Sequence, residues 1–88
     1  MEWKLKFLPK AQRQLESLDK SAQKRILRFL RERLLASPDP RSLGKALVGE
    51  MSGLWRYRIG DYRLICKIED REITIIVLEV GHRREIYR

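Results

Sequence analysis

Two alternating stretches of this chain meet at a two-residue turn, and no other feature of the sequence constrains the fold as strongly. Apolar and polar side chains alternate along residues 54–59 and again along 62–68, which is typical of β-strands. Gly60-Asp61 joins the two stretches as a turn of the hairpin type. Because such a turn fixes which residues face each other, the sequence predicts an antiparallel hairpin of defined register.

The register of this hairpin separates basic from apolar side chains. Ile59 pairs with Tyr62, so Arg58 lies directly opposite Arg63. Paired residues point to the same side of a sheet, and the side-chain period is two. We expect the apolar face of the hairpin to pack against helices. The basic face carries Arg56, Arg58, Arg63 and Lys67, and the apolar face carries Trp55, Tyr57, Ile59, Tyr62, Leu64, Cys66 and Ile68.

The basic face indicates an anion-binding site. Like charges directly opposite each other destabilise a sheet by a few tenths of a kcal/mol, so the pairing of Arg58 with Arg63 has a cost. Arginine presents a planar set of donors that matches phosphate oxygens, so binding of a phosphate would explain why the two arginines face each other. A basic face that is merely solvated is the alternative interpretation.

The first half of the chain predicts one short strand and two helices. Residues 3–8 alternate as a strand does, and Pro9 suits the first turn of a helix. A second, longer helix begins after Asp19 or Ser21, either of which can cap it, and extends to about Leu35.

The second half predicts three strands after a long connection. Residues 41–53 are expected to be mostly loop, and 73–80 form the most hydrophobic strand, followed by a basic tail from Gly81. The order β-α-α-β-β-β predicts a single α+β domain over residues 1–88, with two N-terminal helices packed on a mainly antiparallel four-stranded sheet. One sheet face then remains free of helices, and we expect function there.

The charge of the chain favours a polyanionic partner. Lys and Arg number 20 against 12 acidic residues, which gives a net charge of +8 and a pI near 10.2.

Cys66 is the only cysteine, so an internal disulfide and a thiolate zinc cluster are excluded. No apolar run approaches the roughly 20 residues of a membrane span, and we expect a cytoplasmic protein.

The basic tail places aromatic rings among cations. Arg83, Arg84 and Arg88 alternate there with His82 and Tyr87. Cationic and aromatic groups together suit an exposed RNA base, which proteins bind by stacking and by contacts to phosphate.

Two segments resemble the RelE branch of the RelE/ParE toxin superfamily. They are Trp55-Arg56-Tyr57-Arg58-Ile59-Gly60-Asp61-Tyr62-Arg63-Leu64-Ile65 and Val80-Gly81-His82-Arg83-Arg84-Glu85-Ile86-Tyr87, and Leu47-Val48-Gly49 is similar to the family's segment before the second strand. The resemblance implies a ribosome-dependent endoribonuclease that cleaves messenger RNA in the decoding site of the small subunit. It also implies that the enzyme uses no metal or other cofactor and is neutralised by a cognate antitoxin protein.

The resemblance also assigns roles to single residues. Arg63 matches the family's phosphate-binding arginine, Arg83 the arginine that stabilises or protonates the leaving group, and Tyr87 the tyrosine that stacks on the substrate. Arg56 and Arg58 stand where the family prototype has lysines. The expected catalytic group is Arg58, Arg63, Arg83 and Tyr87. The expected phosphate-binding residues are Arg56, Lys67, Arg84 and Arg88.

The arginines leave the general base of the reaction unassigned. The pKa of arginine exceeds about 12, so Arg56 and Arg58 hold phosphate but do not accept a proton near neutral pH. His82 is the candidate acid or base, because an unperturbed histidine has a pKa near about 6.5. A histidine at a strand end without a catalytic role, with the ribosome supplying the base, is the other interpretation.

Two further functions are compatible with the sequence. A ParE-like toxin would have the same fold, would inhibit DNA gyrase and would not be an enzyme. A basic nucleic-acid-binding module without toxicity would satisfy the charge but not the two motifs.

Overall fold

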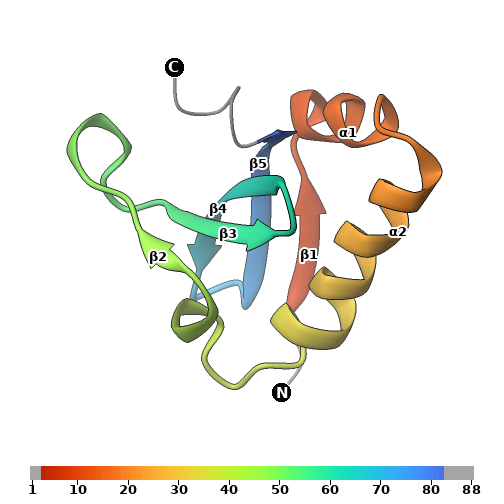
Figure 1. The fold of residues 1–88 in the computed structure, drawn as a ribbon. Helices are drawn as coiled ribbons and strands as arrows, with labels where there is room; N and C mark the ends of the chain where they lie inside the picture. Colours follow the sequence, from red (N-terminus) through yellow and green to blue (C-terminus); the bar gives the residue numbers. More distant parts are fainter. Residues whose placement is uncertain (1–2, 83–88) are drawn as a thin grey trace.

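A computed structural model describes residues 3–82, which form one twisted sheet with helices on one side (Figure 1). The strand order is β1-β5-β4-β3-β2; β1 runs parallel to β5, and every other neighbouring pair is antiparallel. The strands are β1 (Lys4–Phe7), β2 (Lys45–Ala46), β3 (Trp55–Ile59), β4 (Tyr62–Glu69) and β5 (Thr74–His82). The helices are α1 (Pro9–Glu16) and α2 (Lys20–Arg28), with the π-helix η1 (Phe29–Leu34) and the 3-10 helices η2 (Pro40–Leu43) and η3 (Gly49–Met51).

The α+β class and the order of the predicted elements are confirmed, with two corrections. The sheet has five strands rather than four, because the short strand β2 forms within the stretch predicted to be mostly loop. Strand β5 also extends to His82, so Gly81 and His82 belong to the sheet and not to the tail. No helix within residues 3–82 is both long and apolar enough to cross a membrane.

The helices begin where the sequence predicts. Pro9 occupies the first turn of α1, where a missing N–H costs nothing. The Asp19 carboxylate caps α2 by accepting a hydrogen bond from the Ala22 N–H at 2.8 Å. The predicted helix to residue 35 continues past Arg28 as η1, in which the Leu35 N–H donates to the Leu30 carbonyl oxygen, five residues back, at 2.8 Å.

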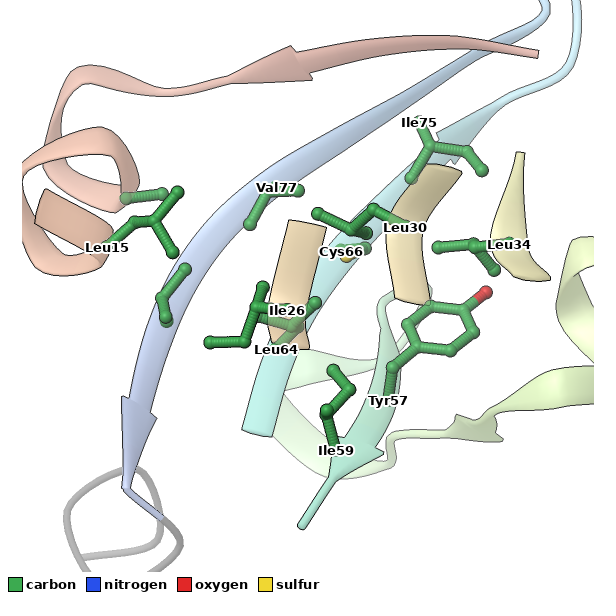
Figure 2. Packing of buried hydrophobic residues seen from close by; sticks show 12 residues of the cluster. Leu15, Ile26, Leu30, Leu34, Tyr57, Ile59, Leu64, Cys66, Ile75 and Val77 are labelled. Atoms are coloured by element: carbon green, nitrogen blue, oxygen red, sulfur yellow. The ribbon is translucent and has the colours of Figure 1, made fainter. Parts of the chain in front are cut away.

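The core lies between the helices and one sheet face. Figure 2 shows Leu15, Ile26, Leu30 and Leu34 of the helices directed at side chains of β3, β4 and β5. The predicted apolar face of the hairpin is therefore confirmed as the face against the helices. The buried strand residues in this cluster are Tyr57, Ile59, Leu64, Cys66, Ile75, Val77 and Val80.

Tyr57 attaches strand β3 to the segment before β2. Its ring is fully buried, and its hydroxyl donates a hydrogen bond to the Pro40 carbonyl oxygen at 2.8 Å. Gly44 passes close to the same ring, since a Cβ there would lie 2.7 Å from the Tyr57 ring and 2.7 Å from the Arg56 carbonyl oxygen. The close approach of this segment to β3 therefore depends on glycine at position 44.

Helix α1 provides a hydrogen-bond partner for β5 beyond the point where β1 ends. The pairing of β1 with β5 ends at Val77, and the next residues of β5 form a bulge. The Gln14 side-chain oxygen then accepts a hydrogen bond from the Val80 N–H at 2.8 Å. A backbone donor that lacks a strand partner is thus satisfied by a helix side chain.

We expect Cys66 to resist thiol reagents in the folded protein. The side chain is fully buried, and burial raises the pKa of its thiol to about 12 from 9.0. Because the thiolate is the nucleophile, such a shift lowers its population at neutral pH by about 1000-fold. Mass spectrometry should show little alkylation of the native protein at pH 8 and complete alkylation in denaturant. Native modification at the rate of a free cysteine would contradict this.

The same burial predicts a loss of stability in alkali. Folding raises the pKa of the Cys66 thiol, so the stability linked to the neutral thiol is complete below pH 9.0 and is lost as the pH rises towards about 12. In a Cys66→Ala variant this part of the pH dependence should disappear.

Candidate functional site

The hairpin of β3 and β4 has the predicted register. Arg58 pairs with Arg63, and Ile59 with Tyr62. Gly60 in the turn has a φ of +58°, a left-handed conformation that glycine adopts without strain. The predicted juxtaposition of two arginines on the sheet face opposite the helices is therefore confirmed.

Four predicted basic residues share this helix-free face. Arg56 lies opposite Ile65, two residues from Arg58 along β3, and Lys67 follows Arg63 by four residues along β4. Arg58 and Lys67 are exposed, whereas Arg56 and Arg63 are half-buried, and the Nε atom of Arg63 is inaccessible to solvent. We call Arg56, Arg58 and Arg63 the arginine cluster.

Strand β2 adds a cation that the sequence interpretation missed. Lys45 pairs with Arg56, so its exposed side chain extends the arginine cluster towards the edge of the sheet. The sequence pattern of a strand is an alternation of apolar and polar residues, and β2 is too short to show it because it contains only Lys45 and Ala46.

Apolar side chains occupy the middle of the same face. Ile65 is only 1% exposed although it points away from the helices, between Arg63 and Lys67. Beside it, the bulge of β5 places Leu78 and Glu79 opposite the one residue Ile65, and Ile76 pairs with Lys67. The face is therefore a cationic surface with an apolar centre rather than uniformly polar.

The acidic side chains of this face are paired with lysines. The Glu79 carboxylate lies 2.6 Å from Nζ of Lys10 in the first turn of α1. Glu69 lies 3.1 Å from Nζ of Lys67, and both groups are partly exposed to solvent, which makes the pair weak. Neither carboxylate removes the positive character of the face.

His82 lies on the other side of the sheet from the arginine cluster. It pairs with Tyr62, and their rings meet edge to face with centroids 6.0 Å apart. Tyr62 packs against the core beneath the helices, so the register assigns His82 to that face as well. Gly81 is instead the residue opposite Arg63.

Four predicted site residues fall outside residues 3–82, namely Arg83, Arg84, Tyr87 and Arg88. The expectation that Arg83 belongs to one catalytic group with Arg58 and Arg63 thus stays a prediction. Within the described part of the chain, no group of three or more His, Cys, Asp or Glu side chains could hold a metal ion.

The arrangement suits binding of a phosphodiester more than proton transfer. Guanidinium groups donate paired hydrogen bonds to phosphate oxygens and stay charged at any physiological pH. Proton acceptance at neutral pH needs a different group from those in the arginine cluster.

Comparisons with known proteins agree with this geometry. The family model described as "ParE toxin of type II toxin-antitoxin system, parDE" matches residues 5–87. "Toxin RelG" of Mycobacterium tuberculosis is 34% identical over 88 residues, covering 100% of this chain and 99% of that protein. A chain in the crystal structure of the toxin–antitoxin complex RelBE2 from the same organism superposes with a TM-score of 0.86 at 29% identity, covering 97% of this chain and 95% of that one. A chain of the archaeal RelE–RelB complex from Pyrococcus horikoshii gives a TM-score of 0.72 at 29% identity, with 97% and 99% covered.

Proposed function

The chain belongs to the RelE family of toxins of type II toxin–antitoxin systems, and from this we propose that it is an endoribonuclease that cleaves messenger RNA in the decoding site of the ribosome. The observation that carries the proposal is the direct opposition of Arg58 and Arg63 on the helix-free face. Two opposed guanidiniums destabilise the free protein slightly but fit one bound phosphate well.

The reaction is an attack of a ribose 2′-OH on the adjacent phosphate. The 2′-OH gives its proton to a base as its oxygen forms a bond to phosphorus, the bond from phosphorus to the 5′-oxygen breaks, and the leaving oxygen takes up a proton. In this scheme Arg58 and Arg63 neutralise the charge that accumulates on the phosphate oxygens, with Arg56 and Lys67 holding neighbouring parts of the strand. Arg83 acts at the leaving oxygen, Tyr87 stacks on a base, and Arg84 and Arg88 add phosphate contacts.

We expect the ribosome to complete the catalytic site. The small subunit holds the messenger strand in a fixed path, which supplies the in-line geometry that a flat protein surface does not impose by itself. It is also the source that we favour for the missing base, since the arginine cluster contains none.

A cognate antitoxin is the expected protein partner. The similar structures from Mycobacterium tuberculosis and Pyrococcus horikoshii are of toxin–antitoxin complexes. The net charge of +8 favours an acidic antitoxin segment that folds as it binds. Growth arrest by the chain alone and rescue by its co-expressed partner would support this role.

Cleavage during translation tests the proposed reaction. Purified chain should cut a messenger RNA within ribosome-bound codons, and the same RNA without ribosomes should remain largely intact. Gyrase supercoiling, assayed in parallel, should be unaffected. Inhibition of gyrase without RNA cleavage would overturn the proposal and favour a ParE-like function, which the description of the matching family model keeps as the second candidate.

We expect His82 to be dispensable for catalysis. His82 and Tyr62 share the helix-covered face, whereas the arginine cluster lies on the opposite one. A His82→Gln variant should therefore keep its single-turnover rate within about threefold and keep its pH profile. A loss of about 100-fold, with the rise through about pH 6–7 abolished, would instead identify His82 as the base.

A further inference from the structure

Away from the arginine cluster, the helix-free face carries three further lysines, Lys4, Lys6 and Lys67, and two of them flank one apolar residue. Lys6 of β1 pairs with Ile76 of β5, and Ile76 pairs with Lys67 of β4. Paired residues share a face, so Lys6 and Lys67 flank Ile76 on the helix-free side of the sheet. Both are exposed, and we call them the lysine pair.

The lysine pair lies far enough from the arginine cluster to contact a different phosphate. Lys67 follows Arg63 by four residues along β4, which corresponds to about 13 Å of strand. The side chains in between are mostly apolar: Ile65 is buried, and Ile76 and Leu78 are half-buried. The exception is Glu79, which lies opposite Ile65 and whose carboxylate is paired with Lys10. The face therefore has cations at two ends and a mostly apolar centre, whose one carboxylate is already paired. In Figure 1 it is the side of the sheet turned away from α1 and α2.

This distribution matches the chemistry of a single-stranded RNA. Its backbone presents negative charges at regular intervals, while its riboses and bases offer less polar surface between them. The Lys67–Glu69 contact is an exposed ion pair, which contributes little and yields to a phosphate. An alternative explanation for an exposed lysine on an edge strand is that it prevents pairing between copies of the chain. This explanation fits Lys6 on the edge strand β1, but it does not fit Lys67, which lies on the middle strand of the sheet.

We propose that Lys6 and Lys67 form a second phosphate subsite, which holds the RNA strand a few nucleotides from the bond that is cut. This inference rests on the proposed endoribonuclease function and deepens it, because it gives the substrate a path across the sheet. The strand runs from the arginine cluster over Ile65 and Ile76 to the lysine pair.

The test compares a long and a short RNA on a charge-removal variant. The probes are a 2′-O-methyl RNA of about ten nucleotides, which reaches both sites, and a dinucleotide, which reaches only one. The double variant Lys6→Gln/Lys67→Gln should bind the long RNA about tenfold more weakly, and the slope of log affinity against log salt should fall by about 1.4. Its affinity for the dinucleotide should be unchanged.

A matched control removes the same charge from the other side of the molecule. Lys24 and Arg31 are exposed on the outer surface of α2 and η1, where they line a cavity of about 310 Å³. The Lys24→Gln/Arg31→Gln variant should keep the wild-type salt slope for the long RNA. Lys67→Gln alone leaves the edge strand unaltered and should reduce the slope by about 0.7.

The outcomes separate the subsite from the proposed function. Wild-type protein that cleaves RNA on ribosomes, together with lysine variants that bind the long probe normally, would overturn the subsite alone. Equal losses in the lysine variant and in the α2 control would also overturn it, since they would reflect net charge. Wild-type protein that neither binds nor cleaves RNA would instead contradict the proposed function.

Discussion

An Arg63→Ala variant should cut messenger RNA on ribosomes about 100- to 1000-fold more slowly than the wild type in single turnover, the loss typical of removing one fixed donor to a developing oxyanion. Arg63 lies opposite Arg58, and its Nε is inaccessible to solvent. A guanidinium held in this way is already oriented when the charge develops, so its removal affects the transition state more than binding.

Two further variants test whether the loss comes from the geometry of the guanidinium or from its charge alone. Arg63→Lys keeps the charge but loses the planar pair of donors, so it should recover only part of the rate. Arg33→Ala removes the same charge from an exposed position on η1 and should leave the rate unchanged. If Arg63→Ala weakens ribosome binding and the bound complex still cuts at the normal rate, Arg63 is a docking residue and its catalytic role is wrong.

Replacing Tyr57 with alanine should lower the free energy of unfolding by about 3–5 kcal/mol, a large part of the roughly 5–15 kcal/mol available to a small domain. The ring is fully buried beside Leu30 and Leu34 (Figure 2), so alanine would leave a cavity in the core. Urea unfolding followed by circular dichroism measures the change.

The hydroxyl of Tyr57 should account for a separate, smaller share. Tyr57→Phe keeps the ring but leaves the buried Pro40 carbonyl without its donor, which should cost about 1–3 kcal/mol. Tyr62→Phe is the matched control on a half-buried tyrosine and should change stability by less than about 0.5 kcal/mol. A Tyr57→Phe variant as stable as the wild type would show that the bond to Pro40 contributes nothing.

Local pattern predicted the hairpin and the helices well, for a physical reason. The turn Gly60-Asp61 and the alternation around it determine register within a few residues, so the opposition of Arg58 and Arg63 followed from sequence. The cap at Asp19 is likewise a short-range signal.

Features that depend on distant residues were not predictable. Strand β2 exists because Lys45 and Ala46 reach β3, and nothing within those two residues specifies that partner. The bulge in β5 is stabilised by Gln14, 66 residues away in the chain, and the sequence around Val80 gives no sign of it. Lys6 and Lys67 come together only through the parallel pairing of β1 with β5, so the second cation pair needed the structure.

The bulge in β5 also determines to which face of the sheet each later residue of the strand points. With strict alternation from Ile75 and Val77, Gly81 would lie under the helices and His82 among the arginines. The extra residue at Leu78 and Glu79 reverses this assignment, so that the residue without a side chain faces Arg63. Which residue faces Arg63 is therefore encoded by a count of residues as much as by their identity. In this strand, deletion of one residue should alter the site more than most substitutions do.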